Sequence, residues 1–271
     1  MAAGLHHVRA GDGPPLVLLA GIGMSGRAWK PVIDRLAPER EVWAVDLPGF
    51  GRSEALPEGE PCGIDELADA AESFFAEQDL DRPHAAGNSL GGGVALELAR
   101  RGTVASVTAI SPAGFASRAE QGFAGASLRR TYAVAERIRP VAPRLFSRPR
   151  LRRLLVGQMF ARPRSLSPAD ANDHLEALLN GPGFHPVLEQ LRGHRFDGRL
   201  EAPATIAWGT RDALLLPTQA LRARRALPEA RHVWLRGCGH VPMSDDPDLV
   251  ARVLLEGSAT ATQKAVASAI G

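Results

Sequence analysis

The chain has 271 residues, of which 45% are hydrophobic and 23% are charged, and its formal net charge is +2. This length predicts one or two domains of about 150 residues each, and the ordinary composition excludes disordered and fibrous classes. The small net charge gives no reason to expect nucleic acid as a partner.

The first residues lack the charged and then apolar pattern of a signal peptide. The apolar stretch at 15–20 is far shorter than the roughly 20 residues that a bilayer span needs. We therefore expect a cytoplasmic protein without a membrane span. The two cysteines, Cys62 and Cys238, have neither the spacing of a metal site nor that of a disulfide framework, so we interpret them as free thiols and expect no metal.

Strands and helices alternate from the start of the chain. Apolar patterns predict strands at 5–8, 16–20 and 41–46, and apolar residues at helical spacing predict helices over 29–36 and 64–75. Alternation of this kind builds a largely parallel sheet with helices on both faces. We therefore expect an α/β fold with a doubly wound, mostly parallel sheet.

Ser89 lies where a short strand, 82–86, gives way to a helix with apolar residues over 94–99. A corner this sharp forces the serine backbone towards positive φ, at a cost of roughly 1–3 kcal/mol, and needs small neighbours. Gly87 and Gly91 provide that room. The helix start favours negative charge near the serine hydroxyl, which suits acyl transfer. A glycine-rich turn without function is the alternative for this motif taken alone.

The alternation stops after a predicted strand at 104–110, and arginine becomes frequent. A helix over 168–178 is indicated by the capping residue Ser167 and by Asp170 in its first turn. We expect a helical cap whose arginines are solvated, with binding of an anionic substrate as the alternative. Its apolar residues should form mostly core and partly the wall of an acyl pocket. They include Phe115, Phe123, Met159, Phe160, Leu178 and Phe184.

The alternation of strands and helices resumes after the cap. Strands are predicted at 204–208 and 231–235, and helices over 218–227 and 248–255. The remaining residues are small and polar, as in a frayed tail. The predicted division of the chain is an α/β core at 1–112 and 201–257, a helical cap at 113–200 and a flexible tail at 258–271.

Two polar residues follow these last strands directly. Asp212 comes after the strand at 204–208, and His240 after the strand at 231–235. In a parallel sheet both loops open at the edge where Ser89 lies, so the three side chains can meet. The order Ser, Asp, His is that of a hydrolase on a doubly wound sheet. Taken singly, Asp212 could be a turn residue and His240 a surface residue.

Four motifs in register resemble those of the α/β-hydrolase superfamily, over essentially the whole chain apart from the cap and the tail. They are DLPGFGRS at 46–53, GNSLGG at 87–92, WGTRD at 208–212 and GCGHVP at 237–242.

The resemblance implies a serine hydrolase that needs neither metal nor organic cofactor. Ser89 would form an acyl-enzyme, His240 would take and return the proton, and Asp212 would orient the imidazole. Backbone N–H groups of Ile22 and Leu90 would hold the oxyanion.

A serine nucleophile argues against epoxide and haloalkane hydrolysis, which need a carboxylate. The run 88–92 resembles enzymes that cleave carbon–carbon bonds in ring-fission diketo acids. That branch usually has Trp soon after its catalytic His, whereas here His240 is followed by Val241, Pro242 and Met243. It also has an Arg early in the cap helix, where this chain has His174. We therefore expect carboxylic ester hydrolysis. The alternatives are carbon–carbon bond hydrolysis, thioesterase, acyltransferase or cofactor-free peroxidase activity, and a ligand receptor on the same scaffold.

The expected partner is a small molecule with an apolar acyl or leaving group, and the sequence leaves monomer and homodimer open. Many relatives have His-Gly where this chain has Ala20 and Gly21, which leaves the choice of Ile22 over Gly23 as oxyanion donor open. The candidate substrate contacts are Gly21, Gly23, Asn88, Phe160, Phe184 and Met243.

Overall fold

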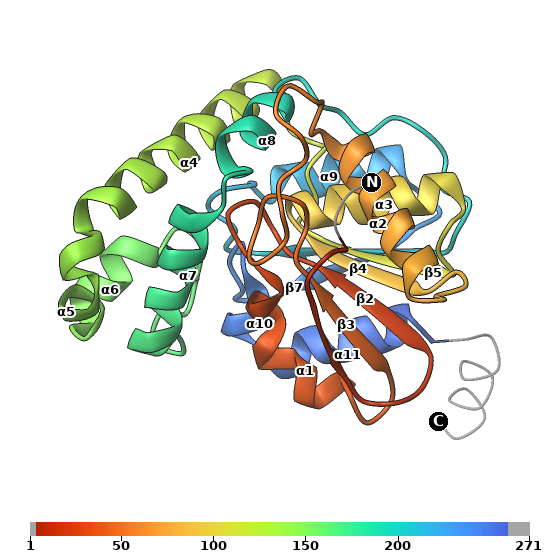
Figure 1. Cartoon of the computed structure of the whole chain (residues 1–271), viewed down its shortest axis with the longest axis horizontal. Helices are drawn as coiled ribbons and strands as arrows, with labels where there is room; N and C mark the ends of the chain where they lie inside the picture. The colour runs from red at the N-terminus through yellow and green to blue at the C-terminus, as the bar shows by residue number, and fades with distance from the viewer. Residues whose placement is uncertain (1–3, 260–271) are drawn as a thin grey trace.

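The computed structural model describes residues 4–259. Within them lies a seven-stranded sheet in the order β1-β3-β2-β4-β5-β6-β7 (Figure 1). Strand β1 is antiparallel to β3, and every other neighbouring pair is parallel. The strands are β1 (His7–Ala10), β2 (Pro15–Leu19), β3 (Glu41–Val45), β4 (His84–Asn88), β5 (Ser106–Ile110), β6 (Ala204–Gly209) and β7 (Arg231–Leu235).

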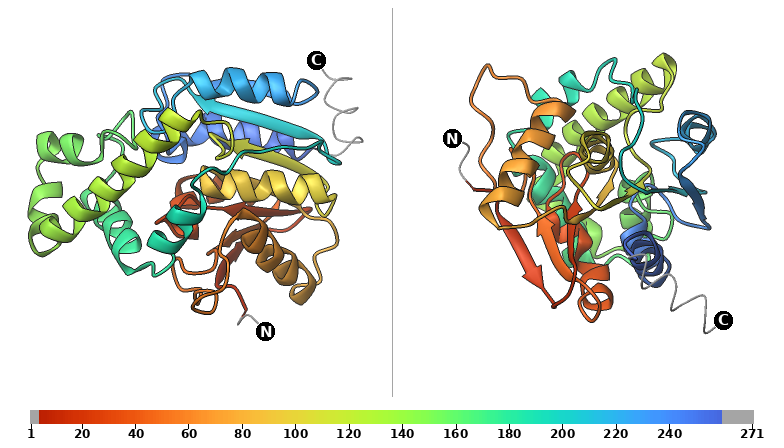
Figure 2. Two further views of the ribbon diagram at one scale, coloured as in Figure 1. Left: turned by 90° about the horizontal axis from the view of Figure 1, so that it is seen from above. Right: turned by 90° about the vertical axis from the view of Figure 1, so that its right-hand side faces the viewer.

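Helices cover both faces of this sheet (Figure 2). Successive side chains of a strand point to opposite faces, so Leu16 and Leu18 of β2 join one core cluster and Val17 and Leu19 join the other. Helices α1 and α11 supply the first cluster, and α2, α3 and α9 the second. The expected doubly wound sheet is confirmed. The bounds are η1 (Gly26–Trp29), α1 (Lys30–Leu36), α2 (Ile64–Glu77), α3 (Leu90–Arg101), α9 (Thr218–Ala226), α10 (Pro242–Asp245) and α11 (Pro247–Gly257).

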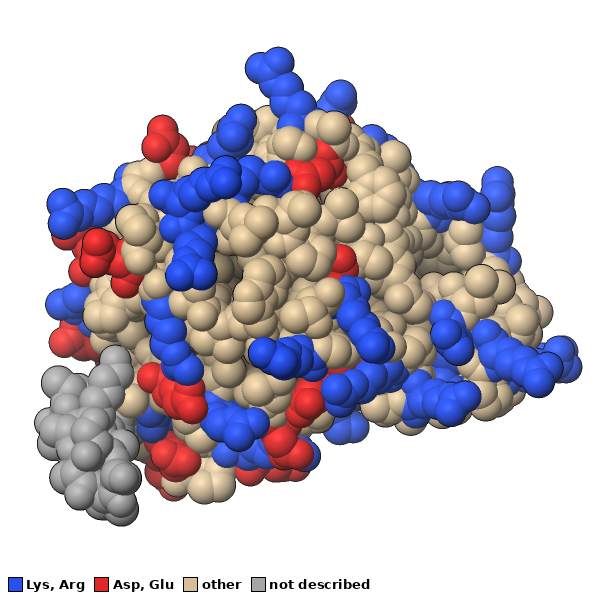
Figure 3. All heavy atoms as spheres, turned by 180° about the vertical axis from the view of Figure 1, so that it is seen from behind, with Lys and Arg blue, Asp and Glu red and all other residues tan. Residues whose placement is uncertain are grey.

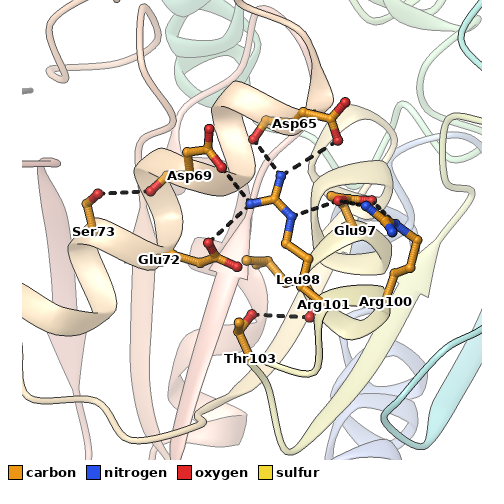
Figure 4. A network of polar contacts seen from close by, with 9 residues as sticks. All are labelled: Asp65, Asp69, Glu72, Ser73, Glu97, Leu98, Arg100, Arg101 and Thr103. Carbon is orange, nitrogen blue, oxygen red and sulfur yellow. Dashed lines mark hydrogen bonds and ion pairs between the residues drawn. The ribbon is translucent and has the colours of Figure 1, made fainter.

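Arg101, the last residue of α3, joins α3 to α2 through a network of carboxylates (Figure 4). Its guanidinium donates to Asp69 at 2.6 Å, to Glu72 at 3.1 Å and to Glu97 at 2.7 Å, and it pairs with Asp65 at 3.6 Å. Burial acts to raise the pKa of Glu97, but hydrogen bonds from Arg100 and Arg101 lower that pKa to about 2. The network therefore fixes the far end of the helix that begins beside Ser89.

The segment between β5 and β6 is helical and extends to one side of the sheet (Figure 1). We call residues 113–200 the helical insertion. The helix expected after Ser167 is present, and the Ser167 hydroxyl accepts the N–H of Asp170 at 3.0 Å. The insertion contains α4 (Arg118–Ile138), η2 (Arg139–Val141), α5 (Ala142–Phe146), α6 (Pro149–Val156), α7 (Pro168–Asn180) and α8 (Phe184–Gln190).

The helical insertion has a net positive charge, whereas the rest of the chain has a net negative charge. Residues 113–200 include 15 Arg and 7 Asp or Glu, so the insertion has a formal charge of +8 and the rest of the chain one of −6. Figure 3 shows basic side chains spread over the end of the molecule that the insertion forms.

Three side chains differ from the expectation. Arg152 is buried and donates to two backbone carbonyls of the insertion, whereas its arginines were expected to be solvated. Phe123, expected in the core, is 48% exposed. Ser258, the first residue of the expected tail, is buried after the end of α11, and its hydroxyl accepts from Arg40 Nε at 3.0 Å. The rest of the expected tail lies almost entirely outside the described residues.

Both cysteines are free thiols, as expected. Among residues 4–259, no helix combines the length and the apolar character that a membrane span requires.

Candidate active site

Ser89 occupies the corner between β4 and α3 with φ at +57° and ψ at −114°. Its N–H donates to the carbonyl of Ile110 at 2.9 Å, which anchors the corner to β5. The flanking glycines are needed for this geometry. A Cβ on Gly87 would lie 2.0 Å from the carbonyl oxygen of Gly91, and one on Gly91 would lie 2.3 Å from that of Leu19. The backbone is thus held in a conformation that non-glycine residues seldom adopt.

His240 and Asp212 meet at the carboxyl edge of the sheet. His240 Nδ1 lies 2.8 Å from Asp212 Oδ2, and both residues are buried. The second carboxylate oxygen accepts the N–H groups of Leu214 at 2.9 Å and Leu215 at 2.8 Å. Because the carboxylate accepts from Nδ1, the neutral imidazole carries its proton there and Nε2 is left as an acceptor. This is the tautomer that a general base requires.

Asn88 connects the Ser89 corner to the His240 loop. Its side-chain Nδ2 donates to the carbonyl of His240 at 3.0 Å and to that of Ile110 at 3.2 Å. The residue is fully buried. It therefore fixes the position of the histidine loop relative to β4, and its amide nitrogen is not available to a substrate.

The other acidic residues near His240 have structural partners. The carboxylate of Asp245 accepts the N–H groups of Gly239, Ala161 and Arg162, at 2.7, 3.1 and 2.6 Å. Asp246 caps α11 by accepting the N–H of Leu249 at 3.1 Å. Asp245 thus joins the histidine loop to the helical insertion.

Ser89 lies in the wall of a cavity of about 270 Å³, together with Ile22 and Leu90. In the described part of the chain, the N–H groups of Ile22 and Leu90 have no hydrogen-bond acceptor. Both donors are therefore free for a ligand. Polar side chains in this wall include Gln121, Gln219 and three arginines, Arg118, Arg129 and Arg192.

A second cavity, of about 600 Å³, lies between the turn after β2 and helices α4, α6 and α7. Its wall is mainly apolar and shares Ile22 and Leu128 with the first cavity. His174 is a polar exception, and desolvation by its surroundings lowers its pKa to about 4. This imidazole is therefore neutral near pH 7.

The structure divides the predicted substrate contacts into two groups. Gly23 and Phe160 lie in the wall of the larger cavity. Gly21 packs on Ser89, since a Cβ there would lie 3.3 Å from the serine Cβ. Phe184 and Met243 are fully buried and, like Asn88, belong to neither wall. These buried residues support the site from behind, because the core packs around them.

Leu128 and Gln219 were not among the sequence candidates. The signal for Leu128 is the stripe of small and apolar residues that α4 turns towards the cavities, at Ala124, Thr131 and Ala135. This stripe follows helical spacing and could have been found. Gln219 is the second residue of α9, and no comparable sequence pattern marks it.

Similar proteins are known both from sequence and from structure. A dihydrolipoyllysine-residue acetyltransferase component of an acetoin cleaving system from Pseudomonas putida is 32% identical over 252 residues, which cover 90% of this chain and 63% of that protein. A pimeloyl-[acyl-carrier protein] methyl ester esterase from Vibrio vulnificus (strain YJ016) is 38% identical over 99 residues, 36% of each chain. This chain therefore spans less than two thirds of either relative.

Solved structures share the fold over nearly the whole chain. A thermophilic esterase from Thermogutta terrifontis has a TM-score of 0.72 at 23% identity and covers 93% of this chain and 92% of its own. A membrane phospholipase A has a TM-score of 0.71 at 26% identity, with 94% and 86% covered. A family model described as the alpha/beta hydrolase family matches residues 16–253. The chain therefore belongs to the α/β-hydrolase family of enzymes.

Proposed function

We propose that this enzyme hydrolyses a small-molecule carboxylic ester through an acyl-enzyme on Ser89. The observation that carries the proposal is the 2.8 Å hydrogen bond between His240 and Asp212, on a loop that Asn88 ties to the serine corner. It supplies a base of the right tautomer at the sheet edge where the nucleophile lies. Esterases among the similar proteins support the choice of substrate class.

In this mechanism, His240 Nε2 takes the Ser89 proton as the serine oxygen attacks the ester carbonyl. The N–H groups of Ile22 and Leu90 hold the oxyanion, and the positive end of α3 adds to that stabilisation. The imidazolium, stabilised by Asp212, then gives the proton to the departing alcohol. Water, deprotonated by His240, releases the acid and restores the serine.

The two cavities support a substrate with two unlike arms. They share Ile22 and Leu128, so an ester group at Ser89 can direct one arm into each. We assign the apolar arm to the larger cavity, where Gly23 and Phe160 lie in the wall. Because most of that wall comes from the helical insertion, we propose that the insertion selects the substrate without supplying the nucleophile, base or oxyanion donors.

The test uses purified full-length protein with a fluorophosphonate probe, a series of 4-nitrophenyl esters and one ring-fission diketo acid. We expect ester turnover and labelling that both depend on Ser89. Ser73→Ala is the matched control, because Ser73 lies exposed on α2 and bonds only its own helix. Turnover of the diketo acid alone would show carbon–carbon bond hydrolysis instead. Saturable binding without labelling or turnover would show a receptor.

A further inference from the structure

Gln219 belongs to the wall of the smaller cavity, and its side-chain amide is buried and unpaired among the described residues. The residue lies near the start of α9, in the segment that follows Asp212, and it is 0% exposed. Among the described residues, neither its Oε1 nor its Nε2 has a hydrogen-bond partner. Its backbone N–H, by contrast, donates to the carbonyl of Leu216 at 2.9 Å. Only the side chain is left without partners.

A buried amide without partners is uncommon in proteins, because its desolvation is not compensated. Leucine has nearly the same size and would fill the position without that cost, so packing does not explain a glutamine here. The segment is also rigid, since Leu214 and Leu215 bind the Asp212 carboxylate and line the same cavity. The amide therefore has a fixed place relative to the catalytic acid.

The other polar groups of this wall restrict what the amide can bind. Gln121 already donates to the carbonyl of His194 at 2.7 Å, and Arg192 pairs with Glu189. Arg118 and Arg129 form no ion pair within residues 4–259. No carboxylate lines the cavity in the described structure. A cationic group is therefore disfavoured, and a carboxylate would leave Gln219 Oε1 facing negative charge.

We propose that the smaller cavity binds an uncharged carboxamide of the substrate, paired with Gln219. A carboxamide donates and accepts side by side, so it forms two parallel hydrogen bonds that use both Oε1 and Nε2. The cavity of about 270 Å³ exceeds the roughly 150 Å³ that holds a benzene molecule, so it takes a short arm that ends in an amide. This inference rests on the proposed ester hydrolysis and adds the class of the second arm.

The experiment compares ester pairs that differ only in hydrogen bonding. In the acyl arm, 4-nitrophenyl 6-amino-6-oxohexanoate is matched with 4-nitrophenyl 6-methylheptanoate, because a carboxamide and an isopropyl group are similar in size and have the same number of heavy atoms. A second pair carries the same two groups in the alcohol arm, and a third compares an ω-hydroxy acyl ester with its alkyl equivalent. Shorter and longer chains of each pair cover the depth of the cavity.

For one arm we expect wild-type kcat/KM to favour the carboxamide by roughly 10- to 100-fold, the value of two neutral hydrogen bonds. Gln219→Leu should remove this preference, because it should lower kcat/KM for the carboxamide ester by that factor more than for the isopropyl ester. Gln190→Leu, an exposed position at the end of α8, should keep the preference. Gln219→Glu, which has the same shape but lacks the NH₂ donor, should also lose it.

A wild-type enzyme that labels and turns over esters but shows no carboxamide preference in either arm would overturn this inference alone. Equal loss on both members of every pair in Gln219→Leu would do the same, since it would indicate a merely structural role. A preference for the hydroxyl and not the carboxamide would also overturn it. If Gln219→Leu does not fold, the wild-type preference still decides. Failure of the proposed function is distinct, because no ester would then be hydrolysed.

Discussion

Asp212→Asn should lower kcat by about 10⁴ while leaving the fold intact, as the same change does in a serine protease triad. In the structure, Oδ1 of Asp212 accepts the N–H groups of Leu214 at 2.9 Å and Leu215 at 2.8 Å, and Oδ2 lies 2.8 Å from His240 Nδ1. An asparagine keeps both backbone bonds only if its oxygen takes the Oδ1 position. Its NH₂ group then faces His240, and Nδ1 must accept.

The consequence is a change of tautomer. The proton of the neutral imidazole moves to Nε2, which can no longer take a proton from Ser89. Because the backbone bonds survive, we expect thermal unfolding close to that of the wild type. If the Asp212 carboxylate only stabilised the charge of the imidazolium, its loss should lower kcat by less than the change of tautomer does. The size of the fall in kcat therefore separates these two roles of the carboxylate.

The assay is kcat for a 4-nitrophenyl ester between pH 5 and pH 9, with circular dichroism to confirm folding. Asp173→Asn is the matched control, since Asp173 is exposed on α7 and pairs with Arg27 at the surface. Near-full activity in Asp212→Asn would refute the reasoning. Loss of activity in folded Asp245→Asn or Asp246→Asn, with Asp212→Asn active, would place the catalytic acid elsewhere.

Three further predictions follow from the site and its surroundings. Ser89→Ala should reduce kcat by about 10⁶ and abolish fluorophosphonate labelling without changing thermal unfolding; retained labelling would assign another nucleophile. Phe160→Ala should shift the preferred acyl length over a series of esters, because this ring lies in the wall of the larger cavity. Phe184 is fully buried, so Phe184→Ala should cost about 3–5 kcal/mol of stability and leave the length profile unchanged. The opposite pattern would contradict the cavity assignment. Burial lowers the pKa of His174 from 6.5 to about 4, so the unfolded chain binds this proton more tightly than the folded chain does. The free energy of unfolding should therefore fall as the pH decreases from 6.5 to 4, by up to about 3 kcal/mol. Urea unfolding at pH 7 and pH 4.5 should show a smaller difference in stability for His174→Phe than for the wild type, and an equal difference would exclude this role.

The elements and the serine corner could be predicted because local sequence determines them. Apolar patterns marked most strands of the sheet, although β1 (His7–Ala10) and β4 (His84–Asn88) each begin two residues after the predicted start. Gly87 and Gly91 marked the place where a helix approaches a strand too closely for a Cβ at either glycine. Asn88 shows the limit of such reasoning. Its motif position suggested a substrate contact, but its amide joins the serine corner to the loop of His240, a residue 152 positions away.

Features that depend on how the helical insertion packs could not be predicted. The burial of Arg152, on α6, and the exposure of Phe123, on α4, both depend on how the helices of the insertion pack, with no strand to set their register. The unpaired amide of Gln219 needs knowledge of every neighbouring donor and acceptor, which no local pattern contains.

The separation of charge between the helical insertion and the rest of the chain makes the molecule a macroscopic dipole. A formal charge of +8 on one end and −6 on the remainder gives a strong field at low ionic strength, although the net charge is close to zero. On a negatively charged support the insertion end should therefore adsorb first, and the exposed arginines of the cavity wall would face the support. Immobilisation through the opposite, acidic end leaves the cavities turned towards solution.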